Sequence, residues 1–169
     1  MQLAGALFIV LACGLMGLTI ARSFVCQVQN IKDLITMLQL LETEIEHSRS
    51  ALPIALQRVG RMGGLVEGFA RTVLSSLADV PGEPFLQAWS AGLDYLRSAG
   101  VSKDLAEDLA VLGAVLGNSG VEDQKRHLRL ARIRLEEFYD AAVEEKRLNF
   151  RLWSYLGFGT GLLIILLII

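Results

Sequence analysis

The sequence predicts an all-α fold, an antiparallel cytoplasmic bundle of about six helices with a transmembrane helix at each end. Hydrophobic residues make up 53% of the 169-residue chain, which is more than an ordinary soluble domain needs. Residues 3–21 and 152–169 contain no Asp, Glu, Lys, Arg or His, so all of the charge lies between them. We therefore expect an N-terminal transmembrane helix (1–21), a cytoplasmic helical domain (22–151) and a C-terminal transmembrane helix (152–169).

The first uncharged segment, residues 3–21, is close to the ~20 residues that an α-helix needs to cross a hydrocarbon core of ~30 Å. A cleaved signal peptide is disfavoured because no Lys or Arg precedes Arg22. Lipid attachment at Cys13 is disfavoured further, because the apolar run continues past that residue. The segment is expected to remain as a membrane span.

The second uncharged segment, residues 152–169, would extend about 27 Å as a helix, which is barely enough to cross the membrane. Gly157 and Gly161 stand four residues apart in it, and Gly17 belongs to a similar row of small residues in the first segment. Such rows allow membrane helices to approach closely, although glycine is also simply common in membrane helices. Both interpretations stay open.

Basic residues near the two uncharged segments predict the orientation of the chain. Arg22 and Lys32 follow the first segment, and Lys146, Arg147 and Arg151 precede the second. Lys and Arg concentrate on the cytoplasmic side of membrane proteins. The middle of the chain should therefore lie in the cytoplasm and both termini on the far side of the membrane.

Two long helices are expected to continue the spans into the cytoplasmic domain. Apolar residues recur at steps of three and four through residues 31–45 and again through residues 128–142, which is the spacing of one helix face. Because both helices end at the membrane, they should run antiparallel and pack side by side. Their apolar stripes are expected to form core rather than a cofactor site.

Shorter helices are expected between the two long ones, because turn residues recur at short intervals. Pro53 fits a helix start, and Pro84 should open a later helix after a turn at residues 80–84. Ser102 can cap a further helix, with Asp104 favourable in its first turn. Breaks or helix ends are expected at Met62-Gly63-Gly64, at Gly100 and at Asn118-Ser119-Gly120.

Several classes of function find no support in the sequence. The net charge of −2, with Lys and Arg dispersed among Asp and Glu, lacks the basic face that nucleic-acid binding favours. Cys13, Cys26, His47 and His127 do not have the spacing of a metal site. No catalytic motif is present, so we expect a protein that is not an enzyme and that needs no metal or cofactor.

Two groups of charged residues are candidates for contact with a partner. Glu42 and Glu44 point in different directions on a helix, which favours a solvated face over a pair of cooperating carboxylates. A basic cluster at the start of the last long helix contains Lys125, Arg126, Arg129 and Arg132. It is either a solvated helix face or a docking site for an acidic partner. Anionic lipid is less favoured, because the cluster begins about 30 Å of helix away from the second span.

Particular residues resemble the stage III sporulation protein AB family. Leu41-Glu42-Thr43-Glu44-Ile45 followed by Leu52-Pro53-Ile54-Ala55-Leu56 looks like its signature. Leu112-Gly113, Leu116-Gly117 and Asp123-Gln124 resemble its central motif, and the segment from Leu156-Gly157 onward resembles its C-terminal anchor. Ala51 departs from the family pattern, which often has a proline there. The resemblance covers essentially the whole chain.

This resemblance implies a protein of endospore-forming bacteria, set in the mother-cell membrane around the forespore as part of a channel-like assembly. The family's domain is similar to the cytoplasmic domains of the platform protein of type II secretion systems (the F component) and type IV pili. That platform is a non-enzymatic scaffold that meets a hexameric secretion-type ATPase and other channel subunits, and a homo-oligomer is also compatible. A membrane-anchored sensor or regulator outside any secretion machine is the alternative.

The same resemblance implies candidate contact residues at positions that match the family's motifs. These candidates are Glu42, Glu44, Pro53, Asp123 and Gln124. Each has a structural alternative: Pro53 starts a helix, Asp123 favours a helix N-terminus, and Gln124 is merely exposed.

Overall fold

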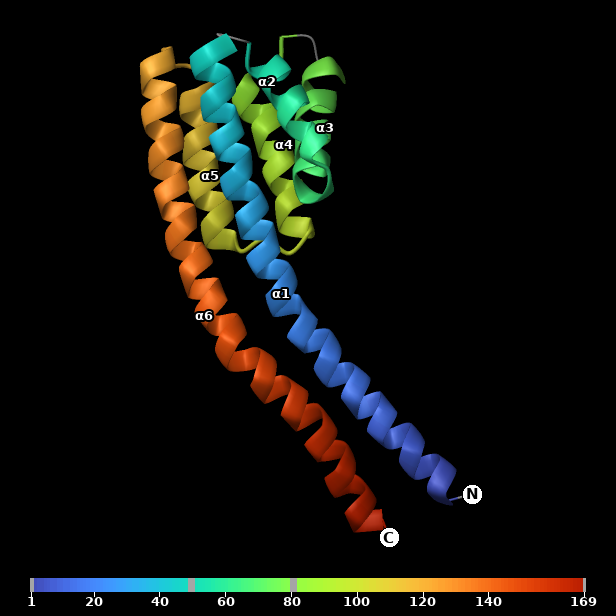
Figure 1. The fold of residues 1–169 in the computed structure, drawn as a ribbon. Coiled ribbons are helices and arrows are strands. Elements are labelled where there is room, and N and C mark those ends of the chain that lie inside the picture. The colour runs from blue at the N-terminus through green and yellow to red at the C-terminus, as the bar shows by residue number, and fades with distance from the viewer. Residues whose placement is uncertain (1, 49–50, 80–81, 169) are drawn as a thin grey trace. The chain divides into compact units, whose positions relative to one another are not determined.

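The computed structural model describes the backbone of residues 2–48, 51–79 and 82–168, and the side chains of residues 15–16, 18–46, 51–79, 82–149, 152 and 155. All of the regular secondary structure in the described residues is helical, which confirms the all-α prediction. They are α1 (Gln2–Ser48), α2 (Leu52–Val59), the 3₁₀-helix η1 (Gly60–Met62), α3 (Gly64–Asp79), α4 (Phe85–Ser98), α5 (Lys103–Leu116) and α6 (Val121–Ile168). Figure 1 shows their order along the chain.

The chain divides into two compact units. Unit 1 comprises residues 1–29 and 140–169, which belong to the N-terminal part of α1 and the C-terminal part of α6. Unit 2 comprises residues 30–139 and contains all of the shorter helices. Because α1 and α6 are each continuous, the prediction that the terminal segments continue the first and last long helices is confirmed.

Unit 2 is a bundle of neighbouring antiparallel helices. α2 packs on α3, and α4 packs between α3 and α5 (Figure 1). The predicted apolar stripe of α1 is buried, as Leu34, Leu38 and Leu41 show, and on α6 Leu128 and Leu135 are buried in the same way. All of the buried side chains in the described part of the chain are apolar.

Trp89 of α4 organises the core between α3, α4 and α5. Its ring meets Phe69 edge to face, with ring centroids 4.9 Å apart and planes at 87°. Its indole Nε1 donates a hydrogen bond to the backbone carbonyl of Leu109 at 2.8 Å. Gly113 of α5 lies against the indole, since a Cβ there would be 2.1 Å from Trp89 Cδ1. α4 and α5 can therefore approach closely because residue 113 has no side chain.

The predicted turn signals fall at the observed helix ends. Pro53 lies in the first turn of α2, and Gly63 (φ 81°) separates η1 from α3, which begins at Gly64 (φ 59°). Gly100 (φ 89°) closes α4, where the chain also makes a hydrogen bond from Val101 N to the Leu96 carbonyl at 3.0 Å. This pattern satisfies carbonyl groups left free at a helix end.

The predicted starts of α4 and α5 are found close to the expected positions, with one difference in how α5 begins. Ser102 occupies the N-cap position of α5, as predicted. Its side chain makes no hydrogen bond to the helix, so the prediction that Ser102 caps α5 through its side chain is wrong. Pro84 is the N-cap of α4, and Phe85 is the first helical residue. Residues 80–81 of the predicted turn lie outside the described residues.

No helix formed by the described residues is both long enough and apolar enough to cross a membrane. Residues 3–14, 153–154 and 156–169 of the two uncharged segments lie outside the residues whose side chains are described. The same holds for Gly17, Gly157 and Gly161. The packing expected of these glycines stays a prediction.

A candidate interaction face on α6

Two ion pairs join the end of α1 to the start of α6 within unit 2. Lys125 Nζ lies 2.9 Å from Glu46 Oε1, and Arg129 Nη2 lies 3.2 Å from Glu42 Oε1. Each step is four residues, which is one helical turn, and the numbers rise on α6 as they fall on α1. The pairs therefore form an antiparallel ladder, here called the α1–α6 ladder. It confirms that the two long helices run antiparallel in this unit.

Glu44 faces the opposite side of α1 and pairs with α2. Its Oε2 accepts a hydrogen bond from Arg58 Nη1 at 2.6 Å. Residues two apart on a helix differ by about 200° in direction, so Glu42 and Glu44 reach different neighbours. The interpretation of these two carboxylates as a solvated face is wrong, because both are used to fix α1 against adjacent helices.

The ladder is asymmetric in its exposure to solvent. The side chains of Lys125 and Glu42 are only 18% and 14% exposed, whereas Arg129 remains largely exposed. The hydrogen bond to Glu46 raises the pKa of Lys125, against a smaller lowering by desolvation, and the nearby charge of Glu122 adds to the rise. Lys125 thus belongs to the helix packing, and Arg129 presents part of its guanidinium outward.

A mixed basic and apolar surface faces away from the bundle on α6. Leu130 and Ile133 are 52% and 45% exposed, and Arg126, which pairs with Asp123 at 3.0 Å, is also exposed. Residues 126, 130 and 133 are spaced as one stripe of a helix. We call Arg126, Arg129, Leu130 and Ile133 the outer face of α6.

A shallow hollow of about 290 Å³ lies on this outer face. It is lined by Glu122, Lys125, Arg126, Arg129, Leu130 and Ile133. Contiguous exposed apolar side chains with a polar rim mark protein interaction sites, and Arg is enriched at such interfaces. The arrangement offers apolar contact and positive charge in one place.

A model of the family described as stage III sporulation protein AB matches residues 2–169 of the chain. The chain belongs to this family. Stage III sporulation protein AB of Bacillus subtilis (strain 168) is 28% identical over 169 residues, which cover 99% of each protein. The resemblance predicted from the sequence motifs is thus confirmed, and the chain is a sporulation protein of this family.

A solved structure of a stage III sporulation protein AB has the same fold. It superposes with a TM-score of 0.66 and covers 73% of this chain and 98% of its own, at 23% sequence identity. This likeness supports the all-α bundle and carries no residue roles.

The three other candidate contact residues of this family member lie in the first turns of α2 and α6. Pro53 is exposed in the first turn of α2. Asp123 lies in the first turn of α6, where its carboxylate pairs with Arg126 and favours the helix N-terminus. Gln124 is not merely exposed: its Nε2 donates to the carbonyl oxygens of Leu116 at 2.8 Å and Ser119 at 3.1 Å. Gln124 therefore holds the end of α5 to the start of α6.

Sequence reasoning missed the apolar half of the outer face. Leu130 and Ile133 fall outside the buried stripe that includes Leu128 and Leu135, and that displacement is the signal that could have identified them. It also missed Arg58 as the partner of Glu44. Among the residues that the structure describes, no three His, Cys, Asp or Glu side chains gather closely enough to hold a metal ion.

Proposed function

We propose that this family member is a non-enzymatic platform subunit of a secretion-like channel assembly required for endospore formation. Two transmembrane helices anchor it in the mother-cell membrane around the forespore, with the helical domain cytoplasmic and both termini on the far side. The outer face of α6 docks an acidic surface of a secretion-type ATPase. The observation that carries the docking proposal is the pair of exposed apolar side chains set among cations on that face.

Membrane anchoring is supported by the sequence and by unit 1. Residues 3–21 and 152–169 contain no charged residue, and α1 and α6 remain helical through most of both segments. Leu15, Met16 and Leu152 are exposed there, as expected of side chains that face lipid. The nearby basic residues, Arg22 and Arg147 among them, favour a cytoplasmic domain.

A scaffold role is supported by the interior of unit 2. Because its described buried side chains are all apolar, the bundle is stiffened by packing and the charged groups stay at the surface. A platform needs a stiff body that transmits docking forces, and the continuous α1 and α6 lead from the bundle toward both anchors. We choose an ATPase as the partner because the family's domain is similar to the platform proteins of secretion systems. This is an argument by analogy of fold.

A second copy of the chain fits the outer face of α6 less well than an acidic partner does. If α6 leads into the membrane, two copies in one membrane carry parallel α6 helices. A symmetric contact would then place Arg126 against Arg126 and Arg129 against Arg129, which is repulsive. A homo-oligomer would have to use another surface, and the outer face is left for an acidic protein.

The docking proposal is tested by the double variant Arg126→Glu/Leu130→Glu of the full chain. We expect the amount of ATPase recovered with the detergent-solubilised protein from sporulating cells to fall about tenfold, because attraction becomes repulsion and an apolar contact is lost. The matched control is Arg97→Glu/Val111→Glu, which changes one exposed arginine on α4 and one exposed valine on α5, both outside the outer face of α6. Unchanged ATPase recovery with the first variant would contradict the proposal.

A further inference from the structure

Within unit 1, α6 carries a stripe of exposed apolar side chains that begins before its uncharged segment. Leu148, Leu152 and Tyr155 are 61%, 55% and 76% exposed. Their spacing of four and three residues places them on one side of the helix. Ala142 and Lys146, which lie on a different side, are buried and half-buried. This part of α6 therefore has an open apolar side and a covered side.

The stripe extends the uncharged segment by one turn. Residues 152–169 would span only about 27 Å as a helix, which is less than a hydrocarbon core of ~30 Å. A segment that starts at Leu148 would span about 33 Å, enough to cross the core with the usual tilt of ~20°. Arg151 is the one charged residue that this extension adds, and a long arginine side chain can reach the headgroups from the edge of the core. The stripe thus supplies the length that the uncharged segment lacks.

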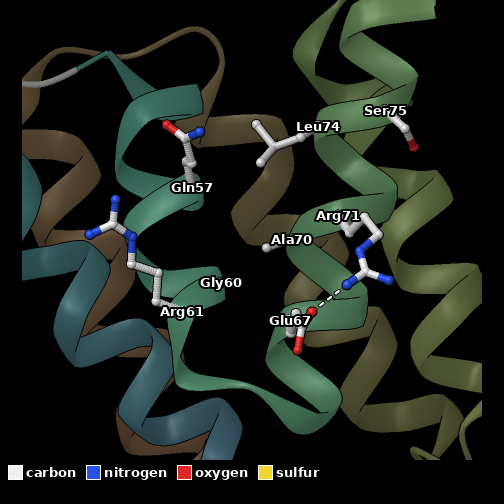
Figure 2. Close-up of a pocket in the computed structure, with 8 residues that line it drawn as sticks. All are labelled: Gln57, Gly60, Arg61, Glu67, Ala70, Arg71, Leu74 and Ser75. Carbon is white, nitrogen blue, oxygen red and sulfur yellow. Dashed lines mark hydrogen bonds and ion pairs between the residues drawn. The ribbon is translucent and has the colours of Figure 1, made fainter.

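Lys146, two residues before the stripe, is an unpaired cation. Other cations of the chain pair with a carboxylate one helical turn away, as Arg71 does with Glu67 (Figure 2) and as Arg147 does with Glu144 at 2.9 Å. Lys146 makes no ion pair with any residue that the structure describes. Its half-buried charge therefore has no counter-ion within the described part of the chain.

The sequence around Lys146 offers it no carboxylate at helical spacing. The residues three and four positions away on α6 are Ala142, Val143, Asn149 and Phe150. None of them is acidic, and the part of α1 that belongs to unit 1, residues 1–29, contains no Asp or Glu. A lysine can bury its stem against a neighbouring helix while its ammonium stays in polar surroundings. An anion from outside the chain is the natural counter-ion at this position.

We infer that the lipid-facing surface of α6 begins at Leu148, and that Lys146 binds the phosphate of an anionic phospholipid in the cytoplasmic leaflet. Leu148 and Leu152 contact acyl chains. Side chains of a helix tilt toward its N-terminus, which directs the Tyr155 hydroxyl back toward the headgroups, where tyrosine is enriched. A protein partner on this stripe would account for neither the missing length nor the unpaired lysine. The inference rests on the membrane anchoring proposed above and adds where lipid contact starts and which lipid class is bound.

Nitroxide labels on the full-length chain, in vesicles of phosphatidylethanolamine and phosphatidylglycerol, measure where lipid contact begins. The label is attached to Leu148→Cys in a chain whose own cysteines are replaced by serine. Oxygen should relax it about threefold more than a water-soluble nickel chelate does, because oxygen partitions into the apolar part of the bilayer. The matched control is Leu130→Cys, which labels another exposed leucine of α6 and should show the reverse preference.

Native mass spectrometry of the full chain released from the same vesicles tests the role of Lys146. Lys146→Gln should lower the affinity for phosphatidylglycerol about fivefold, which is the contribution of one lysine near an anionic surface, and leave phosphatidylethanolamine binding unchanged. Lys103→Gln, which removes one exposed lysine on α5, should change neither. Inorganic phosphate should not displace the lipid, because buried acyl chains add to its binding.

Four results would overturn the inference: a label at residue 148 that prefers the nickel chelate, a label there that protein shields from both reagents, displacement of the lipid by inorganic phosphate, or unchanged phosphatidylglycerol affinity in Lys146→Gln. A label at Thr160→Cys, within the uncharged segment, reports on anchoring alone. Nickel access at residue 160 would reject the proposed membrane anchoring itself. Oxygen preference at residue 160 with nickel access at residue 148 would reject only the earlier start of lipid contact.

Discussion

Different interactions hold α4 against α5 and α1 against α6: close packing of apolar side chains in the first contact, and ion pairs beside an apolar stripe in the second. Around Trp89, the helices meet through aromatic rings and a glycine, and the single polar atom of the indole is satisfied by the Leu109 carbonyl. Between α1 and α6, ion pairs such as Arg129 with Glu42 flank the buried stripe at the edge of the bundle. The first contact tolerates no added volume, whereas the second is open to solvent, salt and competing charges.

This difference assigns separate tasks to the two contacts. Packing around Trp89 supplies stability and a single arrangement of α3, α4 and α5, because close-packed interiors respond to even one added methyl group. The α1–α6 ladder contributes less stability but fixes the register of the two long helices. It also keeps Arg126 and Arg129 facing outward, where a partner can reach them.

The largest effect is expected where the core contact is overfilled. Gly113→Ala places a Cβ 2.1 Å from Trp89 Cδ1, and the ring is held by Phe69 and by its hydrogen bond, so it cannot move away cheaply. We expect the free energy of unfolding to fall by about 2 kcal/mol, even after the gain in helix propensity. Denaturant unfolding of the full chain in detergent, followed by circular dichroism, measures it.

Gly68→Ala is the informative companion to this variant. A Cβ at Gly68 would also collide, at 2.1 Å, but with the hydroxyl oxygen of Tyr95, the far end of a half-buried side chain that can rotate. We therefore expect no loss of stability, or a gain of up to about 1 kcal/mol from helix propensity. Equal losses for the two alanines would show that Trp89 is no more rigidly held than Tyr95.

The sequence was sufficient to predict those features that local signals control. The long helices follow from apolar spacing, and Pro53 and Gly100 mark observed helix ends because their backbone preferences act within a few residues. The exception is Ser102, whose position is right while its capping hydrogen bond is absent. The membrane spans predicted for residues 1–21 and 152–169 stay predictions.

Contacts between distant segments could not be predicted in the same way. Arg129 and Glu42 are 87 residues apart, and which acid meets which base depends on the register of two packed helices. For Gln124 the sequence left a partner contact and mere exposure open, because a side chain that satisfies carbonyls of the preceding helix leaves no periodic pattern. The packing of the end of α2 on α3 likewise depends on the approach of Gly60 to Ala70, which sequence spacing does not encode.

A smaller effect is expected when the ladder is broken. In a double-mutant cycle of Glu42→Gln and Arg129→Gln, we expect a coupling of about 0.2–1 kcal/mol in the free energy of unfolding, typical of a partly exposed ion pair. The coupling should shrink as salt is raised toward 1 M, because exposed charges are screened. A coupling that does not change with salt would mean that Arg129 contributes through packing of its side chain and not through its charge.

The smallest effect concerns the protonation of Lys125. Because the hydrogen bond to Glu46 raises its pKa in the folded chain, the lysine's contribution to stability is complete below its unfolded pKa and is lost as pH rises through the folded value. The parent chain should therefore lose slightly more stability than Lys125→Met between about pH 10 and pH 12, where unperturbed lysines begin to lose their protons. Thermal unfolding of both proteins across this range isolates the effect, since every other titrating group is common to them. Identical pH profiles would mean that Lys125 and Glu46 are not paired in solution, and the ladder would then rest on Arg129 and Glu42 alone.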